Sequence, residues 1–452
     1  MRALDFDAVV VGAGPAGSTA AAHLAAAGLS VALLEKSAFP RDKVCGDALT
    51  PRAVRELQLL GIDPREEDGW HRNRGLRLIG AGHRLEMDWP AVDGMPDFGL
   101  TRARTGLDAA LADHARASGA ELFEHTFAQE PVLGADGGVT GVRAVATDSR
   151  GRKTGDETLF RAPVVIASDG VSARMAVGLG IEKRADRPMG VAVRTYYPSP
   201  RASDDRLESW LELRAPAQAP AGDAAGAGRA RRPREGERGE AMPGYGWLFP
   251  MGDGTVNVGL GILDSSPQFG TVDYRGVLRE WIAAMGHEWS IGEDTMVAKV
   301  RSAALPMAFN RTPHLRAGVL LVGDSAGMVN PFNGEGIDYA MESARLAAEA
   351  VSTVRRYPRA AMHAALREYP DRVRGAFGSY FTLGRIFASL IGRPALMSAG
   401  LKYGMGSETL MRFVVKLLAN LYRGGESDER DLYDRIIVAL ETLVPATDNR
   451  DR

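Results

Sequence analysis

The sequence predicts an α/β protein, in which a Rossmann-like domain carries an inserted antiparallel sheet and is followed by a helical C-terminal region. Three observations predict this class. A glycine-rich turn joins an apolar strand to a small-residue helix near the N-terminus. Strands with period-two alternation recur within residues 187–297, and after residue 371 apolar side chains recur at helical spacing.

Length and composition exclude several classes of protein. The chain has 452 residues, 45% of them hydrophobic and 25% charged, so neither general disorder nor a multi-span membrane protein is expected. The net charge of -2 gives no electrostatic reason to expect a nucleic-acid partner. One cysteine and eight scattered histidines exclude a disulfide framework and predict no metal site.

The first sixty residues predict a dinucleotide site. Residues 6–11 form a predicted buried strand, residues 18–27 a helix, and residues 29–34 a second strand that ends at Glu35. The acidic start and the interrupting glycines argue against a signal peptide or a membrane span here. Glu35 is positioned to accept hydrogen bonds from the ribose hydroxyls of a dinucleotide.

The turn between the first strand and the helix is Gly12-Ala13-Gly14-Pro15-Ala16-Gly17. Gly12 allows the tight turn, Gly14 lets the backbone approach a pyrophosphate, and Gly17 lets the helix pack on the strand. The free N–H groups of the helix N-terminus then bind the phosphates. This part of the chain does not separate FAD from NAD.

Two later strand–turn units favour FAD. A predicted strand at residues 162–168 leads into Asp169-Gly170, and another at residues 318–322 leads into Gly323-Asp324. An aspartate at a strand end can accept a hydrogen bond from a ribityl hydroxyl.

Gly334 and Gly336 then open a predicted helix at residues 337–350. Its N-terminus would stabilise the negative charge of a reduced flavin. The segment around Ser325 also matches the GxSxG turn of α/β-hydrolases, but the only downstream histidine, His363, follows too closely for the expected order of acid and then histidine.

Together these motifs resemble the geranylgeranyl reductase family of FAD-dependent oxidoreductases, within the para-hydroxybenzoate hydroxylase-like fold. The resemblance runs from residue 6 to about residue 420 and is greatest to the actinobacterial menaquinone reductases. Two elements discriminate this family from other flavoproteins of the fold. They are Phe39-Pro40-Arg41-Asp42-Lys43-Val44-Cys45-Gly46-Asp47 and Pro243-Gly244-Tyr245-Gly246-Trp247-Leu248-Phe249-Pro250.

The resemblance implies that FAD is bound by residues from five separate parts of the chain. They are Gly12, Gly14, Pro15, Ala16, Gly17, Glu35, Lys36, Arg41, Cys45, Gly46, Asp47, Arg104, Asp169, Gly170, Gly323, Asp324, Pro331, Gly334, Glu335, Gly336 and Ile337. Arg104, at a predicted helix start, would contact the flavin phosphate or ribityl chain; a surface arginine is the alternative.

Cys45 and Tyr245 are the candidate catalytic residues. The resemblance implies that the Cys45 loop lies near the isoalloxazine ring. Reduction of an isolated isoprene double bond needs a hydride at one carbon and a proton at the other, and a neutral thiol or a phenol can supply the proton. Apolar burial would keep Cys45 neutral, whereas Arg41 and Lys43 would favour a thiolate. A packing role for Cys45 is the alternative.

Tyr245, Trp247 and Phe249 alternate along a predicted strand and therefore face one side of it. Given the resemblance, this face forms the wall of a pocket for a prenyl chain; an ordinary core face is the alternative. Tyr245 and Phe249 depart from the Trp-x-Trp-x-Ile-Pro motif of flavin halogenases, which counts against halogenation.

The predicted domains are discontinuous. The FAD-binding domain takes residues 1–70, 101–186 and 298–370. The substrate-binding sheet domain takes residues 71–100 and 187–297, with strands at 191–197, 207–213, 245–250 and 255–262. Residues 215–242, rich in Ala, Gly, Pro, Arg and Glu, are predicted to be a disordered hairpin insertion. Residues 371–452 form the C-terminal helical region, which either packs on the FAD-binding domain or lies on a membrane surface.

We therefore expect an FAD-dependent reductase that saturates isoprenoid carbon–carbon double bonds, foremost one isoprene unit of the menaquinone tail, by hydride transfer from N5 of the reduced flavin. A geranylgeranyl-lipid reductase, a flavin monooxygenase of the same fold and a non-enzymatic flavin-binding protein are the alternatives. The expected electron donor is NADPH or a ferredoxin. The expected location is the cytoplasm, with peripheral association at the inner face of the cell membrane, because the substrate has a lipid tail.

Overall fold

The computed structural model describes residues 2–214, 241–266, 269–422 and 431–446. Most of the predicted insertion at residues 215–242 lies outside these ranges. Its last two residues do not belong to an insertion, because β17 (Ala241–Met242) pairs with β16 (Leu213–Arg214) in a two-stranded sheet. The predicted insertion therefore ends too late by two residues.

A six-stranded sheet forms the centre of the dinucleotide-binding part. Its order is β21-β22-β13-β2-β3-β9, parallel except for the edge strand β21. The central strands are short runs of buried apolar residues, as expected where helices cover both faces of a parallel sheet. The strands are β2 (Ala8–Val11), β3 (Val31–Leu34), β9 (Glu121–Phe123), β13 (Val165–Ala167), β21 (Leu315–Arg316) and β22 (Val319–Leu321).

Helices from distant parts of the chain pack around this sheet. The first helix, α1 (Pro15–Ala26), lies against both α3 (Arg104–Ala117) and α6 (Ile337–Val354). Helix α2 (Pro51–Leu59) packs on α6 as well, and α4 (Arg174–Gly178) packs on the neighbouring sheet. The predicted strand–turn–helix units are thus confirmed, and together they form one Rossmann-like core.

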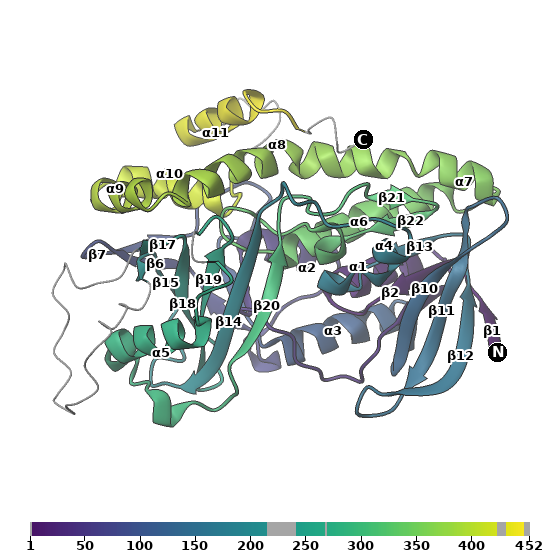
Figure 1. Cartoon of the computed structure of the whole chain (residues 1–452), viewed down its shortest axis with the longest axis horizontal. Coiled ribbons are helices and arrows are strands. Elements are labelled where there is room, and N and C mark those ends of the chain that lie inside the picture. The colour runs from purple at the N-terminus through teal and green to yellow at the C-terminus, as the bar shows by residue number, and fades with distance from the viewer. Residues whose placement is uncertain (1, 215–240, 267–268, 423–430, 447–452) are drawn as a thin grey trace.

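A four-stranded sheet stands beside this core at the end where the N-terminus lies (Figure 1). Its order is β1-β12-β11-β10. The strands are β1 (Arg2–Asp5), β10 (Thr126–Leu133), β11 (Val139–Thr147) and β12 (Lys153–Arg161). A smaller, three-stranded sheet has the order β4-β8-β5. Its strands are β4 (Ala48–Leu49), β5 (His71–Asn73) and β8 (Gly99–Thr101).

A seven-stranded sheet forms the second part, and its order is β20-β14-β19-β18-β15-β6-β7. Every neighbouring pair is antiparallel except β15 and β6, which are parallel. The strands are β6 (Gly75–Gly80), β7 (His83–Asp88), β14 (Met189–Pro198), β15 (Arg206–Trp210), β18 (Gly244–Pro250), β19 (Thr255–Leu263) and β20 (Arg301–Pro306). Helix α5 (Tyr274–Met285) covers one face, over a core that includes Leu248 and Val258.

One predicted domain boundary is wrong. We expected the dinucleotide-binding domain to resume at residue 298, yet β20 pairs along its whole length with β14 in the seven-stranded sheet. The sequence of β20, Arg-Ser-Ala-Ala-Leu-Pro, does not alternate clearly between apolar and polar residues. In the structure only one of its six residues is buried. Pairing with β14, rather than its own side-chain pattern, places it in this sheet.

The C-terminal region is helical, as predicted. Its helices are α7 (Arg359–Ala365), α8 (Glu368–Ile391), α9 (Pro394–Gly404), α10 (Glu408–Leu418) and α11 (Leu432–Thr442). Helix α8 crosses the molecule from the six-stranded sheet toward α9 and α10, which lie over the seven-stranded sheet (Figure 1). Phe377 and Phe381 near its middle are buried, and the helix packs on α6, whereas Ile386 and Leu390 near its end are exposed. Of the described helices, none is long and apolar enough to cross a membrane.

Candidate functional site

The glycine-rich turn has the close contacts that its sequence predicts. Gly12 has φ +96°, and a Cβ there would lie 2.6 Å from the carbonyl oxygen of Ser168 on the neighbouring strand connection. A Cβ on Gly17 would lie 1.8 Å from the carbonyl oxygen of Gly12. Gly14 differs, because its Cβ would face open space with the Arg41 guanidinium 3.8 Å away. Gly12 and Gly17 thus shape the turn, and Gly14 leaves room for a ligand.

Glu35 lies at the end of β3, where the sequence predicts the ribose-binding acid. Its carboxylate accepts a hydrogen bond from the N–H of Ala13 at 3.1 Å and pairs with Arg41 at 3.2 Å. Arg41 also pairs with the buried Asp108 at 2.8 Å. The two carboxylates hold the guanidinium beside Gly14, where it can face a phosphate.

One cavity of about 780 Å³ begins at this turn and extends through the molecule to the C-terminal helices. Its volume is within the usual range for small-molecule sites. All but two of the predicted cofactor-binding residues line it. Gly17 and Gly323 are the two that do not line it; both are packed against backbone or alanine atoms.

Two acidic residues at strand ends face the middle of the cavity. Asp169 follows β13 and Asp324 follows β22, and both line the wall. Oδ1 of Asp169 is buried without a hydrogen-bond partner among the described residues, and burial raises the pKa of this carboxyl to about 6. An unsatisfied buried acceptor is costly, and a hydroxyl of a ribityl chain would satisfy it. The residues present therefore fit a flavin dinucleotide.

The loop before α6 brings a helix N-terminus to the same wall. Asn330 anchors this loop: its side chain donates to the carbonyl of Leu418 at 3.1 Å and accepts from the N–H of Phe332 at 2.9 Å. Pro331, Gly334, Glu335, Gly336 and Ile337 then line the cavity. The free N–H groups at the start of α6 can stabilise an anion there.

The Cys45 loop is attached to the seven-stranded sheet through Asp47. This residue is fully buried with φ 63°, and its carboxyl accepts from the hydroxyl of Tyr196 at 2.5 Å and the amide of Asn257 at 2.7 Å. Asn257 also donates to the carbonyl of Cys45 at 2.9 Å and accepts from the indole of Trp247 at 2.9 Å. Burial raises the pKa of Asp47 to about 6.

Tyr196 and Asn257 were not predicted from the sequence. Tyr196 lies near the end of β14 and Asn257 near the start of β19, where their residue types carry no motif. Only the pairing of these strands brings the two side chains to the Cys45 loop.

The cation nearest to Cys45 is Arg104, rather than Arg41 or Lys43. Burial raises the pKa of the Cys45 thiol, and Arg104 opposes this effect. Arg104 is buried and holds Asp108 with two hydrogen bonds of 2.6 and 2.9 Å, so the surface-arginine alternative is wrong. The net result favours a neutral thiol, because the raised pKa keeps the proton on sulfur at neutral pH.

The aromatic side chains of β18 face the cavity together, as their alternation predicts. Tyr245, Trp247 and Phe249 line it, with successive ring centroids 6.0 Å apart. Leu248 points to the opposite face, into the core under α5. The hydroxyl of Tyr245 donates to the carbonyl of Asn333 at 2.8 Å, so its proton is already used in a hydrogen bond.

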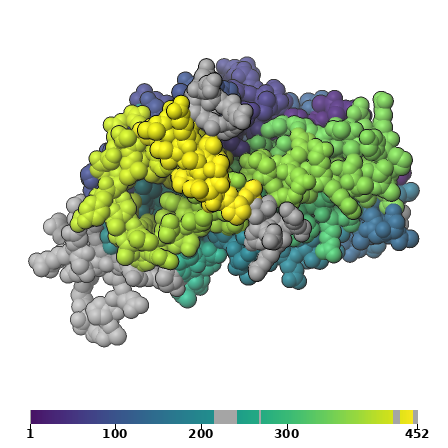
Figure 2. Space-filling model, turned by 90° about the horizontal axis from the view of Figure 1, so that it is seen from above, coloured from purple at the N-terminus to yellow at the C-terminus, as the bar shows by residue number. Residues whose placement is uncertain are grey.

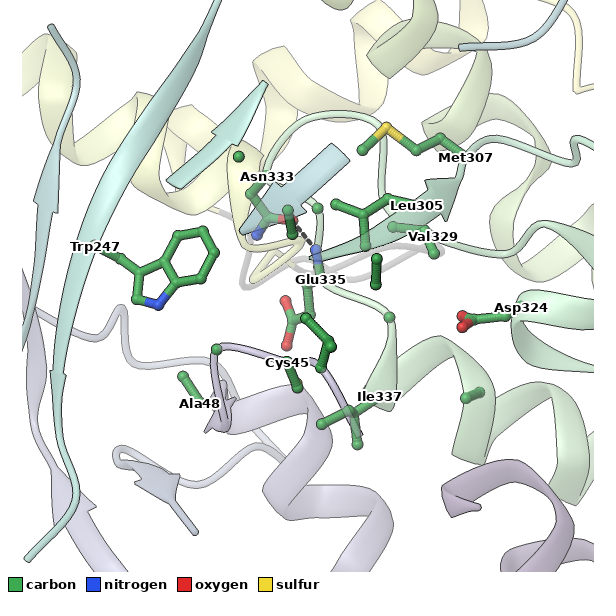
Figure 3. A pocket seen from close by; sticks show the side chains of 18 of the residues that line it. Cys45, Ala48, Trp247, Leu305, Met307, Asp324, Val329, Asn333, Glu335 and Ile337 are labelled. Carbon is green, nitrogen blue, oxygen red and sulfur yellow. Dashed lines mark hydrogen bonds between the residues drawn. The ribbon is translucent and has the colours of Figure 1, made fainter. Parts of the chain in front are cut away.

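Glu335 has surroundings that its motif did not indicate. Its side chain points into the cavity near Cys45 (Figure 3). Oε1 accepts from the hydroxyl of Thr50 at 2.5 Å, and Oε2 is buried without a hydrogen-bond partner among the described residues. Burial raises the pKa of this carboxyl to about 7.

Beyond the aromatic face the lining of the cavity is mostly apolar, with Ser209 of β15 among its residues. Its floor is formed by leucines of the β6–β15 region, and its roof by α9 and α10. The residues are Leu76, Leu78, Leu207, Leu211, Met397, Leu401, Met405, Leu410, Met411, Val414, Val415 and Leu418. From the side of these helices, the surface is hollowed between segments that follow residue 390 (Figure 2). This arrangement can hold a long hydrocarbon chain with one end near Cys45.

The structure excludes the hydrolase interpretation of the GxSxG segment. Ser325 is fully buried, and its hydroxyl contacts the carbonyl oxygens of Ala167 at 2.5 Å and Val322 at 2.7 Å. The imidazole of His363 is hydrogen-bonded to the carbonyl oxygen of Pro163. The serine is therefore a structural residue, with no base beside it.

The chain is similar to known flavoproteins and reductases over most of its length. Residues 5–227 match the FAD binding domain family. The chain is 34% identical over 436 residues to the menaquinone reductase of Mycobacterium tuberculosis, covering 95% of this chain and 94% of the relative. It is 30% identical to digeranylgeranylglycerophospholipid reductase 1 of Methanopyrus kandleri, covering 86% and 91%.

Among solved structures, a geranylgeranyl bacteriochlorophyll reductase-like protein from Thermoplasma acidophilum matches with a TM-score of 0.71 at 19% identity. The match covers 98% of this chain and 100% of the other. The fold of the chain is therefore the fold of that protein, including the C-terminal helical region.

Proposed function

The chain belongs to the geranylgeranyl reductase family of FAD-dependent oxidoreductases, and from this premise we propose that it saturates one isoprene unit of the menaquinone tail. The observation that carries the proposal is the single cavity that joins the glycine-rich turn to the apolar channel under α9 and α10. A dinucleotide site and a hydrocarbon site that share one cavity suit a reaction between a flavin and a prenyl chain.

The residues of the first half of the cavity would bind FAD. Gly14 and the start of α1 would face the pyrophosphate, Glu35 the ribose, and Asp169 the ribityl chain. The N-terminus of α6 would lie beside the ring system. When bound and reduced, FAD supplies a hydride from N5.

The residues of the second half would bind and orient the alkene. Trp247 and Phe249 form a flat apolar wall opposite the α6 N-terminus, and the Cys45 loop closes one end. These side chains exclude water from the double bond, which strengthens the electrostatic interactions of the groups that face it. Cys45 and Tyr245 lie at this end as the candidate proton donors named by the motifs.

The menaquinone tail is favoured as substrate because the relatives with 34–35% identity over almost the whole chain are named menaquinone reductases. A geranylgeranyl lipid is the second candidate, favoured by the archaeal relative named for a digeranylgeranylglycerophospholipid. The apolar channel suits both chains, since no charged residue belongs to its floor or roof.

We further propose that the enzyme meets its substrate at the inner face of the cell membrane. Leu390, Leu396, Tyr403 and Leu410 have exposed fractions of 45%, 48%, 73% and 44%, and Leu396 and Leu410 also line the cavity. Exposed apolar side chains at the mouth of an apolar channel are suited to insertion among lipid chains. The electron donor is proposed to be NADPH or a ferredoxin.

The mass of the product tests the reaction. The flavin-loaded chain is reduced with dithionite, mixed with menaquinone in detergent, and sampled with and without air. An anaerobic gain of two hydrogens in the tail, beyond reduction of the quinone to the quinol, is expected. Gain of one oxygen only in air would instead make the protein a monooxygenase. No change with menaquinone, but reduction of a geranylgeranyl lipid, would select the second candidate.

A further inference from the structure

The cavity contains a carboxyl group that the family motifs do not assign to the reaction. Glu335 stands on the last turn before α6, and Figure 3 shows its side chain directed into the space between Cys45 and Trp247. Its Oε1 is held by the hydroxyl of Thr50, and its Oε2 is buried without a hydrogen-bond partner among the described residues. A buried carboxyl oxygen without a partner is costly unless it is protonated or meets a ligand.

The charges around Glu335 favour the protonated state. Asp338, one turn further along, is fully buried, and the guanidinium that acts on both carboxyls is that of Arg52. Arg52 lies 3.5 Å from Asp338 and is also paired with Glu342. Burial raises the pKa of both carboxyls, and the charge of Glu335 raises that of Asp338 further, while Arg52 opposes the shift of each.

The titratable and charged groups around Glu335 come from several elements. They are Arg52 of α2, Asp338, Tyr339 and Glu342 of α6, Tyr380 of α8, Tyr245 of β18, and Cys45 of the loop before β4. Burial raises the pKa of Glu335 to about 7, and Arg52 and the hydroxyl of Thr50 oppose this effect.

The two donors named by the motifs are less suited to give up a proton. Burial raises the pKa of both Cys45 and Tyr245 above their ordinary values. The hydroxyl of Tyr245 already donates to the carbonyl of Asn333. A general acid works best when its pKa is near the working pH, and among these three groups only Glu335 meets this condition.

We propose that Glu335 is the proton donor of the reduction, a role that rests on the proposed function. The O–H bond of its carboxyl breaks as a C–H bond forms at one alkene carbon, while the hydride of the reduced flavin forms the C–H bond at the other. The alkene gains two electrons, the flavin loses them, and Glu335 is left as a carboxylate. The hydroxyl of Thr50, which donates to Oε1, would stabilise that carboxylate.

The first experiment measures the protonation of Glu335 in the absence of turnover. The flavin-loaded full chain is titrated from pH 5 to pH 9 in an infrared cell, as wild type and as Glu335→Gln, Cys45→Ser and Tyr245→Phe. We expect a carboxylic-acid C=O band that titrates near pH 7 in the wild type, Cys45→Ser and Tyr245→Phe, and that is missing from Glu335→Gln. Asp47 and Asp169 also titrate, so the difference between wild type and Glu335→Gln isolates the band. A difference spectrum without it overturns the proposal.

The second experiment measures the rate of the chemical step. Anaerobic single-turnover oxidation of the reduced flavin by prenyl substrate is followed against pH. In the wild type the rate is expected to fall about tenfold per pH unit above pH 7. Glu335→Gln is expected to be slower by roughly 10²–10⁴ and independent of pH, as for loss of a general acid. The resemblance implies that Glu335 contacts FAD; if its role is proton donation instead, the affinity of Glu335→Gln for FAD stays within about threefold.

Three results would refute the role of Glu335. In the first, Glu335→Gln oxidises the reduced flavin at the wild-type rate and with the wild-type dependence on pH. In the second, Cys45→Ser or Tyr245→Phe loses the pH dependence instead. A third is loss of FAD from Glu335→Gln, which would make the side chain a flavin ligand. A wild-type chain that reduces no prenyl substrate would refute the proposed function itself, a result distinct from these three.

Discussion

Gly14 and Gly17 belong to one motif, and the structure predicts that replacing each by alanine has a different effect. A Cβ on Gly17 would lie 1.8 Å from the carbonyl oxygen of Gly12. Real Cβ contacts essentially never fall below 3.0 Å, so the start of α1 must move by more than about 1 Å. Overpacking of this kind typically costs about 1–3 kcal/mol, and a backbone contact belongs at the upper end.

The matched control is Gly14→Ala. Gly14 has φ -81° and ψ -172°, which any residue adopts, and the nearest atom to its Cβ is 3.8 Å away. The new methyl group therefore meets no protein atom closely but occupies the space over the α1 N-terminus. Gly14→Ala is expected to leave the protein fold unchanged and to weaken FAD binding at least about tenfold, since about 1.4 kcal/mol is tenfold in affinity.

Thermal unfolding of the flavin-free chains separates the two effects. Gly17→Ala is expected to lower Tm by about 3 °C, from about 3 kcal/mol and an unfolding entropy of about 2.1 cal/mol/K per residue over the 452 residues. Gly14→Ala is expected to keep the wild-type Tm, and flavin titration by fluorescence then measures its lost affinity. A wild-type Tm for Gly17→Ala would refute the packing role of Gly17. Unfolding of the flavin-free Gly14→Ala chain would refute the view that Gly14 only leaves space for the ligand.

Three further predictions concern the buried acid, the channel and the outer surface. Burial raises the pKa of Asp47 to about 6, above an unfolded value of about 3.9, so its stabilising contribution is present below about pH 4 and is lost as pH rises through 6. About one pH unit of this window lies above pH 5, so Asp47→Asn should remove about 1.4 kcal/mol of the stability lost between pH 5 and pH 8; denaturant unfolding at these two pH values measures it, and an unchanged loss in the variant would contradict the prediction. Gly400 lines the cavity and a Cβ there meets nothing within 4 Å, so Gly400→Trp should raise the KM for long prenyl chains at least about tenfold and spare short ones. Gly375→Trp, at an equally open position on α8 outside the cavity, is the control, and equal effects of both would argue against the channel. Leu390→Ser with Tyr403→Ser, which replaces two exposed apolar side chains, should reduce co-sedimentation with anionic lipid vesicles about tenfold, and wild-type binding by this double variant would place the membrane contact elsewhere.

The motifs predicted the geometry of the glycine-rich turn and of the aromatic face well, because each of them is local. Gly12, Gly14 and Glu35 lie on one strand–turn–helix–strand unit, whose geometry follows from short-range sterics and hydrogen bonds. The alternation of Tyr245, Trp247 and Phe249 likewise follows from the period of a single strand. The structure confirms these features in the form in which the sequence predicts them.

Other features depended on residues far apart in the chain. Arg104 was ambiguous from the sequence, because a helix start on the surface and one beside Cys45 have the same local pattern. The boundary at residue 298 was wrong because β20 owes its place to pairing with β14 rather than to its own side chains. The anchoring of Asp47 by Tyr196 and Asn257 carried no sequence signal at all.

The sequence by itself determined the Rossmann-like unit, the flavin motifs and the aromatic face, because glycine sterics and strand periodicity act over a few residues. Only the tertiary structure decided how Glu335 is placed. Its partner Thr50 lies 285 residues away in the sequence, and its protonation depends on the burial that α2, α6 and β18 impose together. Desolvation and charge pairing are properties of the assembled cavity, so no local pattern of residues can encode them.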